Sequence, residues 1–382
     1  MGRPTSVLHT VSPSTVTHFT PQPTPIALTV PPQVTPRFPA PPRIPPLSSP
    51  ARPHPTPVPF PALPSSSLAM PPVYTARASP YVCPMQQLPT SIQRLLQEDL
   101  RPEPPTSARV NGFDSHFHLD RMIDHIASKG DYFPRTPSVV KLVGGVVNFC
   151  DPLTFKRALK LLPLLSHYHV AVGVHPKKVP DLNESSFQKL ECLLACPRVA
   201  AISELGIDHT VPSADLIPPQ WNFVRRLLSR GCRNQVLVLH LRPAGRDPCG
   251  HHLHGPFRDL LRQFCGEHQH IHLHNFSGDL PELQEWMAAF KNVYAGVSGL
   301  ALQFNPAQVH MIRNIPSTRL LLETDSPYLP VIPGLPINTP YLLEDVGRLV
   351  SRIRDEDFRE VMRVTAHNAQ VLYSGFAGLT VA

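Results

Sequence analysis

The chain has 382 residues, of which 42% are hydrophobic and 16% charged, so it is long enough for one large domain with a hydrophobic core. Six arginines in the first 97 residues supply +6 of the formal net charge of +7, so overall basicity is weak evidence for nucleic-acid binding. No run of eighteen apolar residues and no charged segment followed by a long apolar one occur, so neither a membrane span nor a secretion signal is expected.

Residues 1–107 are expected to form a disordered tail rich in Pro, Ser and Thr. Of the 49 prolines, 28 lie before residue 106, and no Asp or Glu precedes Glu98. Ser-Pro, Thr-Pro and PxxP patterns could recruit SH3 or WW domains, or partners that recognise phosphate. A short helix is expected at 90–96, near the end of the tail.

From residue 108 onward, short apolar runs alternate with amphipathic segments, which is typical of parallel strands joined by crossover helices. Eight runs predict strands at 110–115, 142–149, 169–174, 199–203, 236–239, 270–273, 293–297 and 320–324. Helical spacing predicts helices at 153–165, 187–194, 221–228, 257–264 and 283–290, with closing segments at 342–353, 357–364 and 369–373. These repeats predict an α/β fold, a (β/α)8 TIM barrel over 108–376, with a C-terminal tail at 377–382. A doubly wound open sheet is the alternative.

The seven cysteines are scattered through the predicted strands and helices. Their spacing is not typical of a zinc finger or of a disulfide scaffold. They predict reduced thiols, and hence a location in the nucleus and/or cytoplasm.

His116 and His118 follow the first predicted strand. Because alternate residues of a strand point the same way, the two imidazoles could share one divalent metal ion. Further candidate ligands follow later strands, at the end of the barrel where active sites are built. They are Glu204 after the fourth strand, His240 after the fifth, His274 after the sixth and Asp325 after the eighth.

These candidates offer four imidazoles and two carboxylates. That is too many donors for one tetrahedral ion, but it suits two ions that share a carboxylate. Glu204 is the natural bridge between the ions. Asp325 could bind a metal ion and also accept the proton of the attacking water. We therefore expect a binuclear centre with Glu204 and Asp325 as its catalytic carboxylates.

Six motifs resemble, in order, the signatures of the TatD family, whose members are metal-dependent deoxyribonucleases with amidohydrolase-like barrels. They are DSHFHLD at 114–120, GVHP at 173–176, SELGID at 203–208, HLR at 240–242, HNFSG at 274–278 and ETDSPYL at 323–329. The resemblance covers about residues 111–374. The long low-complexity leader is similar to that of the vertebrate TatD-domain-containing group.

The resemblance implies that His116, His118 and Asp325 hold one metal ion, that His240 and His274 hold the other, and that Glu204 lies between them. The ions would be Mg²⁺, Mn²⁺ or Zn²⁺. The implied activity is hydrolysis of phosphodiester bonds from strand ends, with DNA as the expected substrate and RNA as the other candidate. The chain departs from the family pattern at Lys177, where a second histidine often follows GVHP, and at Asn275, where cysteine is usual.

Three further side chains are expected to contact substrate. Arg242 could clamp a phosphate with its planar fork, although a surface salt bridge is the alternative. Lys177 and His175 follow the third strand, where His175 could contact substrate or stabilise the loop. Asp208 is expected to orient a ligand imidazole or to steady the loop that carries Glu204.

Other histidines are expected to have structural roles. His272 should fill a layer of the barrel rather than bind metal. His251, His252 and His254 are expected in a solvated loop flanked by Gly and Pro, where adventitious metal binding is the alternative.

Two other functions stay open. The same metals could hydrolyse a small amide, lactone or phosphoester, or the barrel could be a non-catalytic scaffold recruited through the Pro-rich tail. An open groove near Arg242 and Lys177 would favour a nucleic-acid strand, and a closed pocket would favour a small substrate. No membrane partner is expected.

Overall fold

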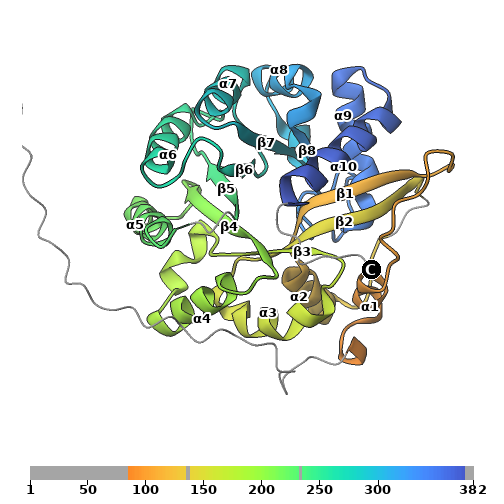
Figure 1. The fold of residues 1–382 in the computed structure, drawn as a ribbon, viewed down its shortest axis with the longest axis horizontal. Helices are drawn as coiled ribbons and strands as arrows, with labels where there is room; N and C mark the ends of the chain where they lie inside the picture. Colours follow the sequence, from red (N-terminus) through yellow and green to blue (C-terminus); the bar gives the residue numbers. More distant parts are fainter. Residues whose placement is uncertain (1–84, 135–137, 232–234, 375–382) are drawn as a thin grey trace, which may run out of the picture. The chain divides into compact units, whose positions relative to one another are not determined.

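The computed structural model describes residues 85–134, 138–231 and 235–374. In this part of the chain, eight parallel strands follow one another around one sheet in the order β1 to β8 (Figure 1). They are β1 Val110–Phe117, β2 Val140–Phe149, β3 His169–Val172, β4 Val199–Asp208, β5 Val236–Arg242, β6 His270–Leu273, β7 Asn292–Val297 and β8 Leu320–Leu322. The predicted parallel sheet is confirmed.

The segment after β8 meets β1 and brings the two ends of the sheet together. Phe117 forms a parallel bridge with Ser326. The amide of Asp325 donates to the carbonyl of His116 at 2.9 Å, and the amide of His118 donates to the carbonyl of Ser326 at 2.7 Å. The TIM barrel is therefore confirmed, and the open sheet is wrong.

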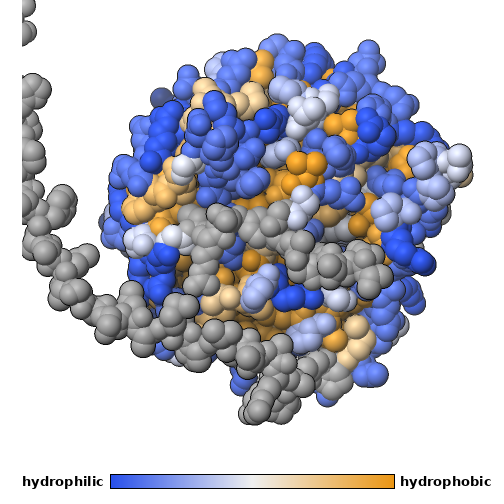
Figure 2. Space-filling model, in the orientation of Figure 1, coloured by the Kyte–Doolittle hydropathy of each residue, from blue (hydrophilic) through white to orange (hydrophobic). Residues whose placement is uncertain are grey.

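Amphipathic helices surround the strands. They are α1 Thr90–Leu96, α2 Leu119–Lys129, α3 Phe155–Leu161, α4 Glu184–Leu194, α5 Ile217–Leu228, α6 His251–Phe264, α7 Leu280–Ala289, α8 Pro306–Asn314, α9 Leu343–Arg354 and α10 Phe358–Ser374. On the face drawn in Figure 2, hydrophilic residues cover most of the outside of this ring. The two closing segments predicted at 357–364 and 369–373 are one helix, α10. No described helix is both long enough and apolar enough to cross a membrane.

The core has two parts. The larger cluster packs the outward side chains of the strands against the helices. The smaller one joins inward side chains such as Phe113, Val146 and Val238 to Tyr373 of α10. His272 is fully buried, with Nδ1 3.0 Å from the hydroxyl of Tyr373. It therefore lies inside the barrel, as expected.

Helix α1 corrects the expected end of the tail. Ile92 and Leu95 are fully buried and belong to the larger core cluster, and the hydroxyl of Tyr168 donates to the carbonyl of Leu95 at 3.0 Å. The predicted boundary at residue 107 is therefore too late, because apolar side chains at helical spacing bury α1 against the barrel. Residues 1–84 and 375–382 lie outside the described residues, so a disordered tail stays a prediction.

The start of α6 corrects a second expectation. His251, His252 and His254 lie in its first turn and not in a loop. Asp247 accepts the amides of Gly250 and His252, at 2.9 and 3.3 Å, so the first turn has acceptors for its free N–H groups. This helix start lies ahead of Gly255 and Pro256, which are residues that usually interrupt a helix.

Candidate metal centre

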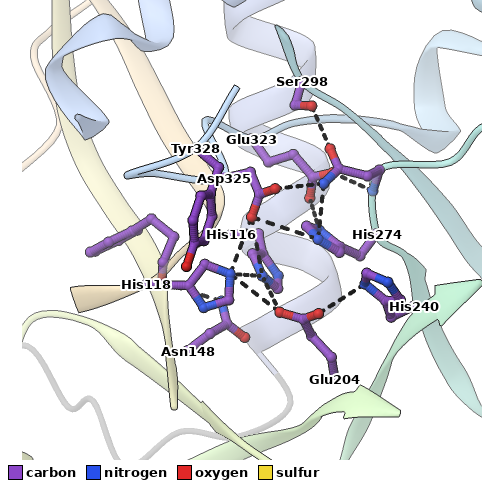
Figure 3. Close-up of polar contacts among 12 residues, drawn as sticks. His116, His118, Asn148, Glu204, His240, His274, Ser298, Glu323, Asp325 and Tyr328 are labelled. Atoms are coloured by element: carbon purple, nitrogen blue, oxygen red, sulfur yellow. Dashed lines mark hydrogen bonds and ion pairs between the residues drawn. The ribbon is translucent and has the colours of Figure 1, made fainter. Parts of the chain in front are cut away.

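The six predicted ligand residues come together at the carboxyl ends of the strands (Figure 3). His116 lies in β1, with His118 just beyond it, while His274 and Asp325 follow β6 and β8. Glu204 and His240 lie inside β4 and β5, because these two strands are longer than predicted. Five of the six are buried, and His240 is partly exposed. The structure thus gathers residues that are more than 200 positions apart in sequence.

One oxygen of Glu204 faces the two histidines of β1. Glu204 Oε1 lies 3.3 Å from His116 Nε2 and 3.2 Å from His118 Nε2, and the two nitrogens are 3.2 Å apart. Asp325 Oδ1 lies 3.1 Å from His118 Nε2 and 3.9 Å from His116 Nε2. Two imidazoles and two carboxylates therefore point at one small volume.

The second oxygen of Glu204 faces the other side of the centre. Glu204 Oε2 lies 2.9 Å from His240 Nδ1. Glu204, His240 and His274 form a group whose ligand atoms all lie within 4.8 Å of one another, and so do His116, His118 and Glu204. Glu204 is common to both groups, which is the arrangement that two ions sharing a carboxylate require.

The donor set fits divalent metal ions. Imidazole nitrogen and carboxylate oxygen are ligands for Zn²⁺ and Mn²⁺, and carboxylates also suit Mg²⁺. The ligand-type atoms that face one another here come from buried residues; they are His116 Nε2, His118 Nε2 and Glu204 Oε1. The centre thus concentrates buried donor atoms that a cation would satisfy.

The charges of the centre also favour cations. Burial, together with the neighbouring His274, lowers the pKa of His116 to about 3, so this imidazole stays neutral. Burial opposes charge on Glu204, but His175 and His116 outweigh it and lower the pKa of Glu204 well below its usual range. Burial would lower the pKa of His274, yet Glu323 and Asp325 raise it to about 9. The carboxylates around His274 therefore stabilise positive charge in this part of the centre.

Two carboxylates contact ring nitrogens of two candidate ligands, His240 and His274. Asp208 Oδ2 lies 3.2 Å from His240 Nε2, and Glu323 Oε2 lies 3.2 Å from His274 Nδ1. Such contacts fix the tautomer and the orientation of a ligand imidazole. Asp208 was predicted either to do this or to steady the loop that carries Glu204, and its role stays a prediction.

Sequence reasoning missed Glu323 and gave Asn275 no role. Glu323 is fully buried; it also accepts the Asn275 amide at 2.5 Å and lies 3.0 Å from His272 Nε2. Asn275 Nδ2 donates to Asp325 Oδ2 at 2.8 Å, and its oxygen accepts the hydroxyl of Ser298. Asn275 has φ +46°, a left-handed conformation that Asn adopts more readily than most residues. A carboxylate inside the predicted eighth strand was the available signal for Glu323, because a buried charge needs a partner.

The expected substrate contacts lie on the rim of the centre. His175 Nε2 lies 3.6 Å from Glu204 Oε2, and Lys177 Nζ lies 3.5 Å from Asp208 Oδ2. Arg242 ends β5 two residues beyond His240 and is partly exposed. Their roles toward substrate stay predictions.

Comparison with known proteins matches residues 113–374 to the family described as TatD related DNase. The chain is 26% identical over 321 residues to human "3'-5' RNA nuclease TATDN2", a match that covers 74% of this chain but only 39% of that relative. It is 30% identical over 209 residues to "3'-5' ssDNA/RNA exonuclease TatD" of Edwardsiella piscicida, covering 53% and 76%. The crystal structure of a hydrolase TatD family protein from Entamoeba histolytica has the same fold, with a TM-score of 0.54 at 18% identity, over 69% of this chain and 99% of that one.

Proposed function

The chain belongs to the TatD-related DNase family, and from this we propose that it is a two-metal nuclease that hydrolyses phosphodiester bonds of DNA from strand ends. The observation that carries the proposal is the position of Glu204. One of its oxygens faces His116 and His118 while the other faces His240. A single carboxylate between two sets of imidazoles suits a pair of ions.

The candidate ligands fall into two sets. One ion would be held by His116, His118 and Asp325, and the other ion would be held by His240 and His274. Glu204 would touch both ions. The ions would lower the pKa of the attacking water and neutralise charge on the phosphate. His274 and His118 outweigh the effect of burial and lower the pKa of Asp325, so that it is an anion. As a carboxylate anion beside the proposed ions, it would accept the water's proton.

Several exposed groups near the centre suit a nucleic-acid strand. Tyr328 is 48% exposed, and its ring centroid lies 5.7 Å from that of His118. An exposed ring beside the reacting phosphate could stack on a base. Lys177 and Arg242 are the cations expected to contact phosphates. The names of the human and Edwardsiella relatives describe those proteins as nucleases that act in the 3'-5' direction. This supports our proposal that the present chain cleaves from the 3' end.

Single-stranded oligonucleotides labelled at the 5' end test this proposal. DNA and RNA of one sequence would each be assayed with Mg²⁺, Mn²⁺ and Zn²⁺. We expect stepwise shortening of DNA from the 3' end, and a loss of about 100-fold or more in Asp325→Asn with the fold retained. Unchanged turnover in this variant would refute the assignment, and faster hydrolysis of RNA would correct the substrate.

The proline-rich segment and the location of the protein remain proposals. The Ser-Pro, Thr-Pro and PxxP patterns lie outside the described residues, so partners of SH3, WW or phosphate-dependent type rest on sequence alone. A nuclear and/or cytoplasmic location rests on the expectation of reduced cysteines.

A further inference from the structure

A second group of histidines lies at the start of α6, on the same end of the barrel as the metal centre. We call His209, Asp247, His251 and His252 the rim cluster. His209 directly follows β4, Asp247 lies between β5 and α6, and His251 and His252 are the first two residues of α6. The rim cluster shares no residue with the six ligand candidates of the centre.

Two imidazole nitrogens of the rim cluster face each other. His209 Nδ1 lies 3.0 Å from His252 Nε2. Two imidazoles bound to one tetrahedral zinc ion at about 2.0–2.1 Å would have their nitrogens about 3.3 Å apart, so a small movement would admit an ion. Both side chains reach solvent, which leaves room for water to complete the coordination.

The other nitrogen of His252 is held by a carboxylate. His252 Nδ1 lies 2.8 Å from Asp247 Oδ2, and Asp247 Oδ1 accepts the amide of Gly250 at 2.9 Å. A proton on Nδ1 that donates to Asp247 leaves the lone pair of Nε2 directed at His209. This carboxylate and histidine relay is the arrangement that orients zinc ligands.

The surroundings of the rim cluster carry negative charge. His251 bridges two carboxylates, with Nδ1 3.2 Å from Asp247 Oδ1 and Nε2 2.9 Å from Asp279 Oδ2. Asp279 also caps α7 by accepting the amide of Glu282. Both acids are therefore fixed in place by the backbone, and they favour a cation nearby.

We propose that His209 and His252 bind a transition-metal ion, with Zn²⁺ as the best match, and that Asp247 orients His252 for this task. Nitrogen ligands select Zn²⁺ over Mg²⁺, which prefers oxygen. The inference is independent of the proposed nuclease activity. A direct hydrogen bond between two neutral imidazoles is the alternative that the experiment must exclude.

Zinc content of the 382-residue protein tests this site. The protein and its variants would be dialysed against buffered Zn²⁺, and bound zinc would be counted by mass spectrometry. We expect the double variant His209→Ala/His252→Ala to hold one zinc ion per chain fewer than the parent protein. His268→Ala is the control, because His268 is 78% exposed and lies outside the cluster. Equal zinc content in all three proteins would overturn the proposal.

A second variant keeps the test valid if the double variant misfolds. Asp247→Asn retains both imidazoles and removes only the carboxylate charge, so we expect zinc at this site to bind about 10- to 100-fold more weakly. The difference between calorimetric Zn²⁺ titrations of the parent protein and of Asp247→Asn isolates the rim cluster, because the metal centre is the same in both proteins. An affinity unchanged by Asp247→Asn would contradict the role of the carboxylate.

Discussion

At the level of single residues, the candidate metal centre places carboxylates against the histidine nitrogens that face away from it. Glu323 is the most deeply placed of them, and it contacts His272, His274 and the amide of Asn275. Asp208 does the same for His240. A candidate ligand supported in this way keeps one nitrogen directed at the centre, because its other nitrogen already has a partner.

Replacing Glu323 by Gln should weaken metal binding without removing any ligand. An uncharged amide supports the imidazole of His274 less strongly, so we expect metal affinity to fall by about 10- to 100-fold and hydrolysis to fall with it. Titration with Mn²⁺ would measure the affinity. Glu285→Gln is the matched control, since Glu285 is 67% exposed on α7. An unchanged affinity for Mn²⁺ would show that Glu323 does not position the centre.

The six ligand candidates could be predicted because each one ends or follows an apolar run. In a barrel all such positions lie on one rim, so residues that are far apart in sequence meet in the folded structure. Glu323 could not be assigned in the same way, because it precedes Asp325 by only two residues and spacing does not say which acid meets which imidazole. The contacts of Asn275 depend on its left-handed backbone, which no sequence pattern specified.

At the scale of elements, glycine lets β4 and β5 approach where the centre is built. A Cβ atom on Gly206 would lie 1.8 Å from the carbonyl oxygen of His240. Gly206 lies two residues beyond Glu204 and pairs with His240 across the two strands. Packing therefore explains the glycine of the SELGID motif, because the strands that carry Glu204 and His240 are too close together there for a side chain.

The variant Gly206→Ala should push these strands apart. We expect a loss of about 1–3 kcal/mol in the free energy of unfolding, from overpacking, and a clear loss of hydrolysis. Urea denaturation and the oligonucleotide assay would measure the two effects. Gly266→Ala is the control, because a Cβ atom there would meet no atom within 4 Å. Equal behaviour of the two variants would contradict this account of the motif.

Helix α1 should contribute to the stability of the barrel. Leu95 is fully buried, so Leu95→Ala should cost about 2–5 kcal/mol in the free energy of unfolding by leaving a cavity. Arg94→Ala, on the exposed side of the same helix, should cost little. Urea denaturation compares the two variants, and similar midpoints would show that α1 does not stabilise the barrel.

Element boundaries were harder to predict than element types. All eight strands match predicted runs, because a parallel strand that is covered on both faces leaves a continuous apolar signature. The start of α6 was missed for two reasons. Gly255 and Pro256 are residues that usually interrupt a helix, and the first turn is supported by Asp247, which lies in the preceding loop. The packing of α1 was missed because its neighbours in sequence are rich in proline.

At the scale of the whole molecule, stability should fall in mild acid. Burial, together with the nearby Arg198 cation, lowers the pKa of His169 to about 4. A depressed pKa in the folded state means that the stabilisation is complete above about pH 6.5 and is lost as the pH falls toward 4. Denaturant unfolding at pH 7.5 and pH 5 would show the loss, and it should be smaller in His169→Phe. His268→Gln should behave like the parent protein, and an equal loss in all three would exclude His169 as the source.

The proposed mechanism requires that two ions share Glu204 at the carboxyl end of the barrel. Anomalous diffraction from crystals soaked in Mn²⁺ would locate these ions. We expect two peaks about 3.5–4 Å apart, one beside His116 and His118 and the other beside His240 and His274, with Glu204 in contact with both. A single peak, or peaks away from Glu204, would rule out a pair of ions shared by Glu204.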